Sequence, residues 1–416
     1  MKFKIKTSFN VPETFYLLAL GLHICVSIFE ASLFAHFFTA TLRIAIVYFC
    51  AALIVGGELL KTRITIKEIV FGVVCLFLAG ILYKRAFEAG LIFLLVFAGR
   101  KVDFKKTAQC VIIVSCISTA FIILCAHLGI IKNYVDSNLE GTEFRVRRYL
   151  GFLYALFPSA ILFNVTSLDL YIHRNFLSWK RCLFWLGVNF YIFLQTDSRL
   201  SFGTVALEIV LLYLIGNQPK IKEICDKYSF PLVFSCIFSA CFMIFFTLSY
   251  NPRKLWMRRL DKLIGYRLHL GYNAMRLYPV TLFGQKVKFI GNGLQANGKT
   301  TAGTYNYVDC LYESILIRFG LVFLAITVAL LSISLVVSWK ERNYSLLIIL
   351  SIFSFHGILD DLIINLQYNT FWIVVGLCIV RHYSVCEEQI AFENIRLHLP
   401  KSLRKSLNFL HKRGVS

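Results

Sequence analysis

The chain has 416 residues, of which 58% are hydrophobic and 16% are charged, and its formal net charge is +21. This composition, with apolar runs that recur without a soluble domain between them, excludes a soluble multidomain protein and indicates a polytopic membrane protein. The basic residues form short clusters between the apolar runs, as in proteins that orient themselves on anionic lipid, which argues against a nucleic-acid partner.

Twelve apolar segments are candidate transmembrane helices. The first, 11–29, follows Lys2, Lys4 and Lys6 and is not closed by a small-x-small cleavage site, which favours a first helix with a cytoplasmic amino end over a signal peptide. The others are 38–56, 69–83, 86–99, 107–131, 149–172, 182–195, 200–215, 230–249, 311–338, 345–359 and 362–380. Four are shorter than the roughly 20 residues that a perpendicular span needs, so we predict about twelve spans.

A long polar segment, 250–310, separates the first nine of these spans from the last three. It carries ten Lys or Arg residues between Arg253 and Lys299, which predicts an anionic partner. We therefore expect an all-α polytopic protein with nine helices in 1–249, one large extracytoplasmic loop in 250–310, three helices in 311–380 and a basic cytoplasmic tail in 381–416.

The positions of the basic residues predict the orientation of the chain. If the amino end is cytoplasmic, every short inside loop is basic, as the positive-inside rule requires, and the carboxyl end is also cytoplasmic. The same orientation leaves Arg145, Arg147, Arg148 and the 250–310 loop outside. Because long loops weigh little in orientation, we interpret these external cations as retained for function.

The segment Gly293-Leu-Gln-Ala-Asn-Gly-Lys-Thr300 fits the P-loop pattern GxxxxGK[ST]. A P-loop also needs a buried strand before it and a helix after it, whose amino end meets the phosphates. Thr300 is followed by Thr-Ala-Gly-Thr-Tyr-Asn, which is not a helix start, and the segment lies on the predicted outer side. A turn rich in Gly and Asn is therefore favoured over a nucleotide site.

Arg199 follows Thr196-Asp-Ser between two apolar runs, at or just below the predicted outer membrane surface. An arginine there is costly unless it is paired. It either forms a salt bridge with Asp197 or another external acid, reaches toward the surface unpaired, or binds a phosphate through its planar guanidinium. Arg147 and Arg148 are less specific, since arginines at a helix start are often only solvated or in contact with lipid headgroups.

His356 and Asp360 are four residues apart on a predicted helix, so they share one face near an outer membrane boundary. Such a pair suits a metal site or a His–Asp base. Two ligands are too few for a metal, and a local hydrogen bond that holds the helix end is the favoured interpretation.

Several short blocks, in this order, resemble the Wzy-type repeat-unit polymerases that build bacterial O-antigen, capsule or exopolysaccharide, which are relatives of the O-antigen ligases. The blocks are Arg148-Tyr-Leu-Gly-Phe152, Asp197-Ser-Arg199, Tyr266-Arg-Leu with Pro279 and Leu282-Phe-Gly284, Tyr307-Val-Asp309 with Gly320, and 356–369. Each block alone is weak, whereas their order, spacing and predicted topology together are fairly specific.

The resemblance implies a GT-C-like membrane glycosyltransferase of the bacterial cytoplasmic membrane. Similar proteins transfer a glycan from a polyprenyl-pyrophosphate carrier to a second glycan or lipid outside that membrane, without nucleotide, metal or other cofactor. The implied partners are lipid-linked oligosaccharide repeat units, the lipid bilayer, and the chain-length regulator and flippase of the same pathway. Ligases resemble one another in a His at the spacing where this chain has Asp309, which favours polymerase over ligase.

The candidate residues suit that reaction. Breaking a sugar–pyrophosphate bond releases a stable anion, so fixed positive charge matters more than an acid, and we expect this charge to come from Arg199, Arg267, Arg147, Arg148 and Arg276. The attacking sugar hydroxyl must lose a proton, for which Asp309 is the first candidate and the His356–Asp360 pair the second. Tyrosines in and around the loop, among them Tyr305 and Tyr307, either stack on sugar rings or only mark the membrane interface.

A flippase or secondary transporter of polyprenyl-linked oligosaccharide is the main alternative from another class. Twelve spans suit it, and arginines within the protein would bind a lipid-linked anion. It predicts two similar halves and polar residues near mid-membrane at broken helices. The sequence shows no internal repeat, and the external loop has no counterpart in the other half.

Overall fold

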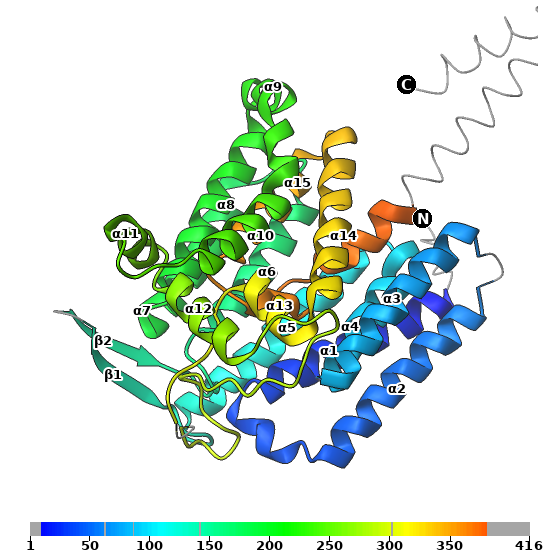
Figure 1. The fold of residues 1–416 in the computed structure, drawn as a ribbon. Coiled ribbons are helices and arrows are strands. Elements are labelled where there is room, and N and C mark those ends of the chain that lie inside the picture. Colours follow the sequence, from blue (N-terminus) through cyan, green and yellow to red (C-terminus); the bar gives the residue numbers. More distant parts are fainter. Residues whose placement is uncertain (1–9, 62–63, 86, 141–142, 301–302, 381–416) are drawn as a thin grey trace, which may run out of the picture.

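The computed structural model describes residues 10–61, 64–85, 87–140, 143–300 and 303–380, and these form a helical bundle (Figure 1). Its first half contains α1 (Val11–Glu30), α2 (Ala40–Leu59), α3 (Ile66–Arg85), α4 (Gly90–Ala98), α5 (Phe104–His127), α6 (Phe157–Ile172), α7 (Trp179–Thr196) and α8 (Arg199–Asn217). The second half contains α9 (Pro219–Tyr228), α10 (Ser235–Leu248), α11 (Leu255–Leu263), α12 (Arg267–Leu277), α13 (Leu311–Phe319), α14 (Leu321–Lys340), α15 (Tyr344–His356) and a final helix over 372–380. Short 3₁₀ turns lie at Leu33–Phe37, Phe87–Ala89, Gly99–Lys101, Phe230–Phe234 and Leu362–Ile364. The predicted tail, 381–416, and the three lysines before residue 10 lie outside the described residues.

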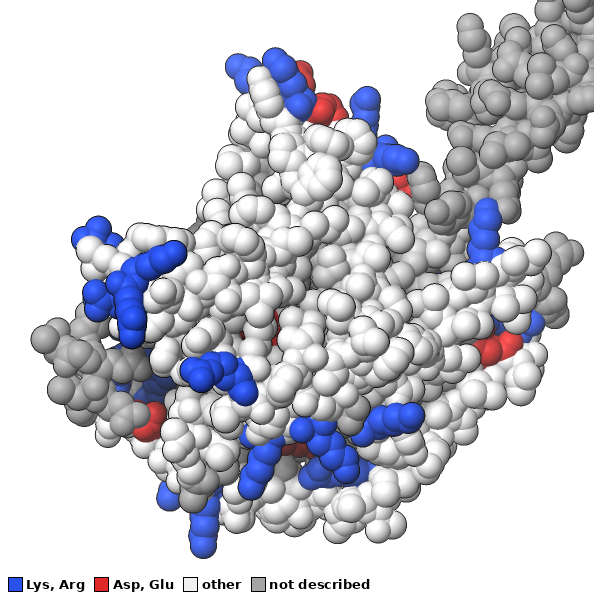
Figure 2. Space-filling view, viewed as in Figure 1, with Lys and Arg blue, Asp and Glu red and all other residues white. Residues whose placement is uncertain are grey.

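Seven helical segments are long and apolar enough to cross a membrane among the described residues: α1, α2, α3, α5, α8, 230–248 and α14. Figure 2 shows a broad, largely uncharged surface across the middle of one face, with most basic side chains toward its rim, including those over α9 and α11. Length, composition and surface thus indicate an α-helical membrane protein.

One small β-hairpin lies at the end of the bundle opposite α9 (Figure 1). Its strands are β1 (Val135–Glu140) and β2 (Glu143–Arg148), which pair antiparallel with Val135 opposite Arg148. We call this the hairpin end. The expected span 149–172 is wrong in its first part, because the hairpin leads into an irregular segment and α6 begins only at Phe157, just before Pro158.

The expected span 311–338 is divided into α13 and α14 at Gly320, whose φ is +92°. An added Cβ at Gly320 would overlap the backbone of Leu282 and Gly284, so the two glycines allow loop and helix to pass in close contact. The loop is held there because Leu321 N–H donates to Thr281 O at 3.0 Å and Val322 N–H donates to Leu282 O at 3.1 Å. These contacts fix the loop to the helices.

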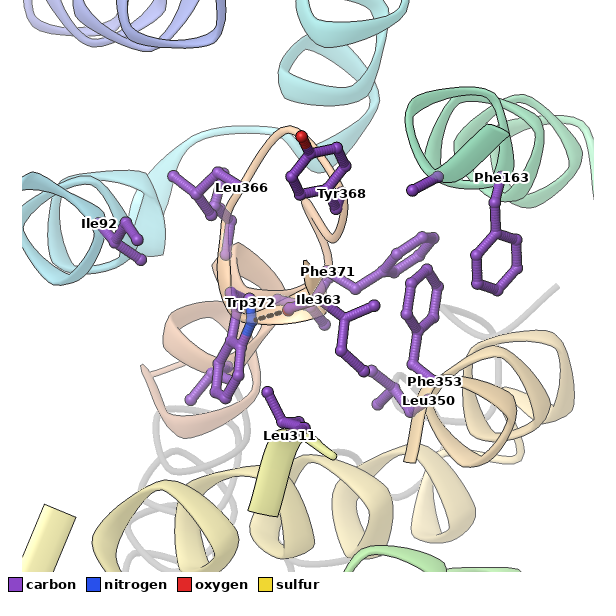
Figure 3. Close-up of a cluster of buried hydrophobic side chains, with 14 of the residues drawn as sticks. Ile92, Phe163, Leu311, Leu350, Phe353, Ile363, Leu366, Tyr368, Phe371 and Trp372 are labelled. Atoms are coloured by element: carbon purple, nitrogen blue, oxygen red, sulfur yellow. Dashed lines mark hydrogen bonds between the residues drawn. The ribbon is translucent and has the colours of Figure 1, made fainter. Parts of the chain in front are cut away.

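The expected span 362–380 is helical only from residue 372. The preceding turns are held by Asn164 of the central, almost fully buried helix α6, whose Nδ2 donates to Thr370 Oγ1 at 2.9 Å and whose Oδ1 accepts from Thr370 N at 2.9 Å. Trp372 Nε1 donates to Ile363 O at 2.8 Å, and Phe371 packs on Phe353 in the same buried cluster (Figure 3). Irregular backbone is tolerated here because it is enclosed by protein.

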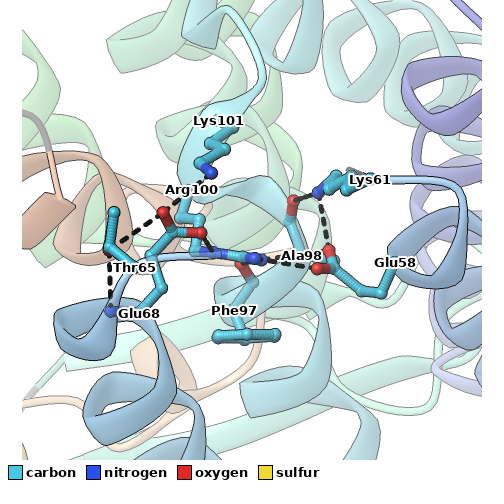
Figure 4. A network of polar contacts seen from close by, with 8 residues as sticks. All are labelled: Glu58, Lys61, Thr65, Glu68, Phe97, Ala98, Arg100 and Lys101. Atoms are coloured by element: carbon cyan, nitrogen blue, oxygen red, sulfur yellow. Dashed lines mark hydrogen bonds and ion pairs between the residues drawn. The ribbon is translucent and has the colours of Figure 1, made fainter. Parts of the chain in front are cut away.

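A buried ion cluster joins the adjacent ends of α2, α3 and α4 (Figure 4). The Arg100 guanidinium, which is fully buried, contacts both carboxylate oxygens of Glu58 at 3.0 and 2.8 Å and Glu68 Oε2 at 2.9 Å. Lys61 lies 2.6 Å from Glu58, and Lys101 lies 2.7 Å from Glu68. Each buried charge therefore has an opposite charge beside it.

Candidate functional site

A pocket at the hairpin end brings together residues from four distant segments. Its cavity measures about 140 Å³. The walls come from the segment before α6, the first residue of α12, the loop before α13 and the turn after α15. The lining residues are Tyr154, Leu156, Phe157, Arg267, Gly291, Asn292, Gly293, Tyr305, Tyr307, Asp309, Leu359, Asp360, Asp361 and Leu362. Three of the eight predicted site residues, Arg267, Asp309 and Asp360, thus line one cavity.

Arg267 is aimed into the pocket by the turn before it. Gly265 and Tyr266 both have left-handed backbone, with φ of +65° and +64°, and reverse the chain between α11 and α12. The guanidinium then donates to Gly265 O at 2.7 Å and to Leu359 O at 3.2 Å. Its Nε is buried and has no hydrogen-bond partner among the described residues. The guanidinium is therefore fixed by two backbone carbonyls, and one of its donors has no partner among the described residues.

Asp309 lies beside this cation rather than at a helix cap. Its Oδ2 accepts from the Tyr305 hydroxyl at 3.1 Å and lies 3.7 Å from Arg267 Nη2. The residue at the N-cap position of α13 is Cys310, and no side chain caps that helix. Burial raises the pKa of Asp309, the cation of Arg267 and the hydroxyl of Tyr305 act in the opposite direction, and the charge of Asp360 raises the pKa further.

Asp360 lines the pocket, whereas His356 is not part of the lining and contacts Asp360 from outside. The imidazole Nε2 of His356 lies 3.5 Å from Asp360 Oδ2, which confirms the predicted proximity of the two side chains. The two residues are not on one helix, however, because α15 ends at His356 and Asp360 lies in the following turn. The Thr204 hydroxyl donates to Leu200 O at 2.8 Å, so it accepts from Nδ1 of His356 at 3.4 Å. His356 thus lies between Thr204 of α8 and Asp360 of the pocket and contacts both.

Asp361 is a buried acid in the pocket that falls within the 356–369 block but is not one of the predicted site residues. It accepts from the Tyr307 hydroxyl at 2.8 Å and lies 3.4 Å from the Ser314 hydroxyl. Burial, followed by the nearby charges of Asp360 and Asp309, raises the pKa of Asp361 to about 7. Three carboxyl groups thus share one pocket, and the pKa of one of them, Asp361, is raised close to neutral pH.

The raised pKa of Asp361 predicts a pH dependence of stability. Because the folded state binds this proton more tightly than the unfolded state, the free energy of unfolding falls as the pH rises from about 4 to about 7, by up to roughly 1.4 kcal/mol per pH unit. We expect Asp361→Asn to remove this part of the slope, since the amide is uncharged at every pH. Thermal unfolding in detergent at several pH values checks this, and equal slopes for wild type and variant would contradict it.

The other predicted arginines do not line the pocket. Arg199 is 60% exposed and pairs with Asp197 at 3.1 Å, the salt bridge that the sequence analysis gave as an alternative, and Arg145 pairs with the same carboxylate. Arg148 donates to Gln195 at 2.8 Å. Arg276 is exposed beside the ring of Tyr272, with its guanidinium carbon 5.8 Å from the ring centroid. These side chains lie outside the pocket lining because tertiary packing sets the positions of the helices and strands that carry them. Sequence spacing alone does not predict those positions.

Arg147 differs from these arginines. It lies on β2 with its Nε buried and without a hydrogen-bond partner among the described residues. Its charge lowers the pKa of Tyr154, a pocket residue, against the larger effect of burial, which raises that pKa to about 12. Arg147 therefore acts electrostatically on the pocket from outside its lining.

The P-loop-like segment forms a turn. Leu294 and Thr300 are joined by an antiparallel bridge, and Gln295 N–H donates to Lys299 O at 2.8 Å. No helix follows within the described part of this loop. Only its first residue, Gly293, lines the pocket, together with Gly291 and Asn292.

The helix that carries Arg267 is held in place by close packing at Gly271. The Glu313 carboxyl of α13 receives a hydrogen bond from the Thr247 hydroxyl, and its Oε2 lies against Gly271. An added Cβ at Gly271 would overlap this carboxyl group, which is fully buried. Gly271 thus fixes the separation between α12 and α13.

Gly271→Ala is expected to destabilise the fold by about 1–3 kcal/mol, because the fully buried Glu313 carboxyl would have to shift away from Gly271 and from the Thr247 hydroxyl that donates to it. Gly187→Ala in α7 is the matched control, since an added Cβ there meets nothing within 4 Å, and a small stabilisation of roughly 0.5–1 kcal/mol is expected. Thermal unfolding of both purified variants measures the difference. Equal unfolding temperatures would contradict the packing role of Gly271.

The chain matches no protein-family model, no curated protein and no solved structure in the comparisons made. Among the described residues, no group of three or more His, Cys, Asp or Glu side chains has an arrangement that holds a metal ion. What the pocket offers is one fixed arginine, three carboxyl groups in different environments and several tyrosines. Such a set can bind an anion, accept a proton and contact sugar rings.

Proposed function

We propose that the protein is a polysaccharide polymerase of the Wzy type in the bacterial cytoplasmic membrane. In this proposal it is GT-C-like with about twelve spans, the shorter apolar helices crossing as well, both chain ends are cytoplasmic, and the hairpin end faces outward. It transfers glycan from a polyprenyl-pyrophosphate donor to another lipid-linked repeat unit. The observation that carries the proposal is the placement of Arg267 beside Asp309 in the lining of one pocket.

In this proposal, pocket residues assist both the departure of the leaving group and the attack of the acceptor. The donor's anomeric carbon–oxygen bond breaks, and the electron pair leaves with the pyrophosphate, whose charge Arg267 neutralises. The acceptor hydroxyl oxygen forms the new glycosidic bond, and its proton passes to Asp309, which lies 3.7 Å from Arg267. Tyr154, Tyr305 and Tyr307 supply aromatic walls beside the reacting sugars.

The proposal is tested by Arg267→Ala in cells of the source strain. We expect polymer to be lost and single lipid-linked repeat units to accumulate on the outer face of the membrane, with a rate decrease of about a hundredfold or more. Arg267→Lys should restore little, because it keeps the charge but loses the planar fork. Arg276→Ala is the matched control on the same helix and should make normal polymer.

The same experiment separates the alternatives. If the protein is a flippase, loss of Arg267 leaves the repeat units on the cytoplasmic face. If it is a ligase, polymer still forms on its lipid carrier and is not transferred onward. Normal polymer in Arg267→Ala at a normal protein level would overturn the proposal.

A further inference from the structure

A second, larger cavity adjoins the pocket at the hairpin end. It measures about 530 Å³ and lies between α1 and the turns after α15. Phe157 and Leu362 line both this cavity and the pocket that contains Asp309 and Asp360. The two spaces therefore share a wall made of two apolar side chains. A ligand in the larger cavity would be next to the carboxyl groups of the smaller one.

The depth of this cavity follows from α1. Glu30, at the end of α1, and His23, seven residues earlier, both line it. At 1.5 Å per residue, it extends about 10 Å along the helix axis from the hairpin end. The cavity thus reaches well below the loops into the helical bundle.

His23 is the most informative residue of this cavity. His23 is only 9% exposed and lines the cavity. It forms no hydrogen bond, ion pair or ring contact with any residue that the structure describes. Its ring nitrogens keep some accessible surface, and because the side chain lines the cavity, a ligand or water there can satisfy them. Its imidazole offers one donor and one acceptor to a molecule in the cavity.

The charge of the lining distinguishes this cavity from the pocket beside it. The pocket contains Arg267, whereas none of the described residues that line the larger cavity is Lys or Arg, and the one acid among them, Glu30, is paired with Arg43 at 3.1 Å. A pyrophosphate is therefore disfavoured here. The remaining polar lining consists of His23, Ser27, Asn365, Gln367 and Tyr368, beside the aromatic ring of Phe157. Neutral donors and acceptors next to aromatic faces suit the hydroxyl groups and apolar faces of a sugar.

We propose that this cavity binds the acceptor glycan, the neutral sugar end whose hydroxyl attacks the donor held at Arg267. The inference rests on the proposed function and extends it by giving the two substrates separate places. Because the cavity and the pocket share Phe157 and Leu362, an acceptor bound here has its hydroxyl groups beside the side of the pocket where the carboxyl groups lie. His23 is a binding residue for the acceptor and does not touch the reacting atoms.

The probe for a test is the lipid-free repeat-unit oligosaccharide, released by mild acid from the lipid-linked pool of the source cells. It lacks the pyrophosphate leaving group, so it can act only as acceptor. Transfer to it by purified protein is measured at varied acceptor concentration, and then at varied lipid-linked donor concentration. We expect His23→Phe, which keeps the ring and removes its hydrogen bonds, to raise the acceptor KM about tenfold and to leave the donor KM unchanged.

Ser27→Trp, which places an indole ring in the space that the acceptor would occupy, should abolish use of the acceptor. Leu18→Trp, at a 56% exposed position of the same helix, is the matched control and should behave as wild type. Equilibrium binding of the same oligosaccharide to these proteins tests the proposed acceptor site without requiring turnover. Binding that is weaker in His23→Phe and lost in Ser27→Trp supports the proposal, and equal binding by wild type and both cavity variants overturns it. Wild type that binds the oligosaccharide but transfers nothing would overturn the proposed polymerase activity and leave the binding site standing.

Discussion

Asp309→Asn is expected to remove most turnover while the protein folds and accumulates normally. The amide keeps the shape of the side chain and can still meet the Tyr305 hydroxyl, but it cannot accept a proton from the acceptor. General bases contribute roughly 10²–10⁴-fold to such reactions, so we expect a decrease of that order in polymerisation rate. The measurement is the rate of polymer formation by purified protein on lipid-linked repeat units, normalised to folded protein.

A carboxylate that does cap a helix supplies the control. Asp103 accepts from Lys105 N at 3.1 Å at the start of α5, and Asn caps a helix about as well as Asp, so Asp103→Asn should leave both stability and rate near wild type. Wild-type turnover in Asp309→Asn would mean that Asp309 has a structural role and does not accept the proton. The proton acceptor would then be sought at Asp360, which His356 supports from behind.

Arg100→Ala is expected to destabilise the protein by about 3–5 kcal/mol. Removal of this guanidinium leaves Glu68, which is 1% exposed, and part of the Glu58 carboxylate without their main counter-charge in a buried environment. Three helices lose their common contact at once, since Glu58, Glu68 and Arg100 come from the ends of α2, α3 and the turn after α4 (Figure 4). The expected result is a large fall in the thermal unfolding temperature and in the amount of protein in the membrane.

A surface ion pair provides the comparison for this variant. Arg342 is 76% exposed and lies 3.9 Å from Asp226, so Arg342→Ala should cost less than about 1 kcal/mol. Replacement of Glu58, Lys61, Glu68 and Arg100 together by apolar residues of similar size should recover much of the stability, because no buried charge is then left without a partner and Lys101, which is 36% exposed, can reach water. An Arg100→Ala protein as stable as Arg342→Ala would mean that water reaches the buried carboxylates.

The sequence by itself determined the class of the protein and the ends of most long helices. A hydrophobic run such as that of α5 or α14 specifies a helix because, in lipid, its backbone groups must be satisfied within the segment. The turn at Gly293–Thr300 was also predictable, since Gly and Asn there are incompatible with the helix that a P-loop requires. The proximity of His356 and Asp360 followed from four-residue spacing, which brings side chains together in a helix and in a helical turn alike.

Only the tertiary structure decided where helices break and which polar residues meet. The break before residue 372 depends on Asn164, more than 190 positions away in the chain, and the pocket joins Arg267, Asp309 and Asp361 from three different segments. Arg199 and Arg267 have the same chemistry in the sequence, yet one pairs with Asp197 at the surface and the other enters the pocket. The physical reason is that local sequence sets backbone periodicity and hydrophobicity, whereas the partner of a polar side chain is set by packing between segments distant in the chain.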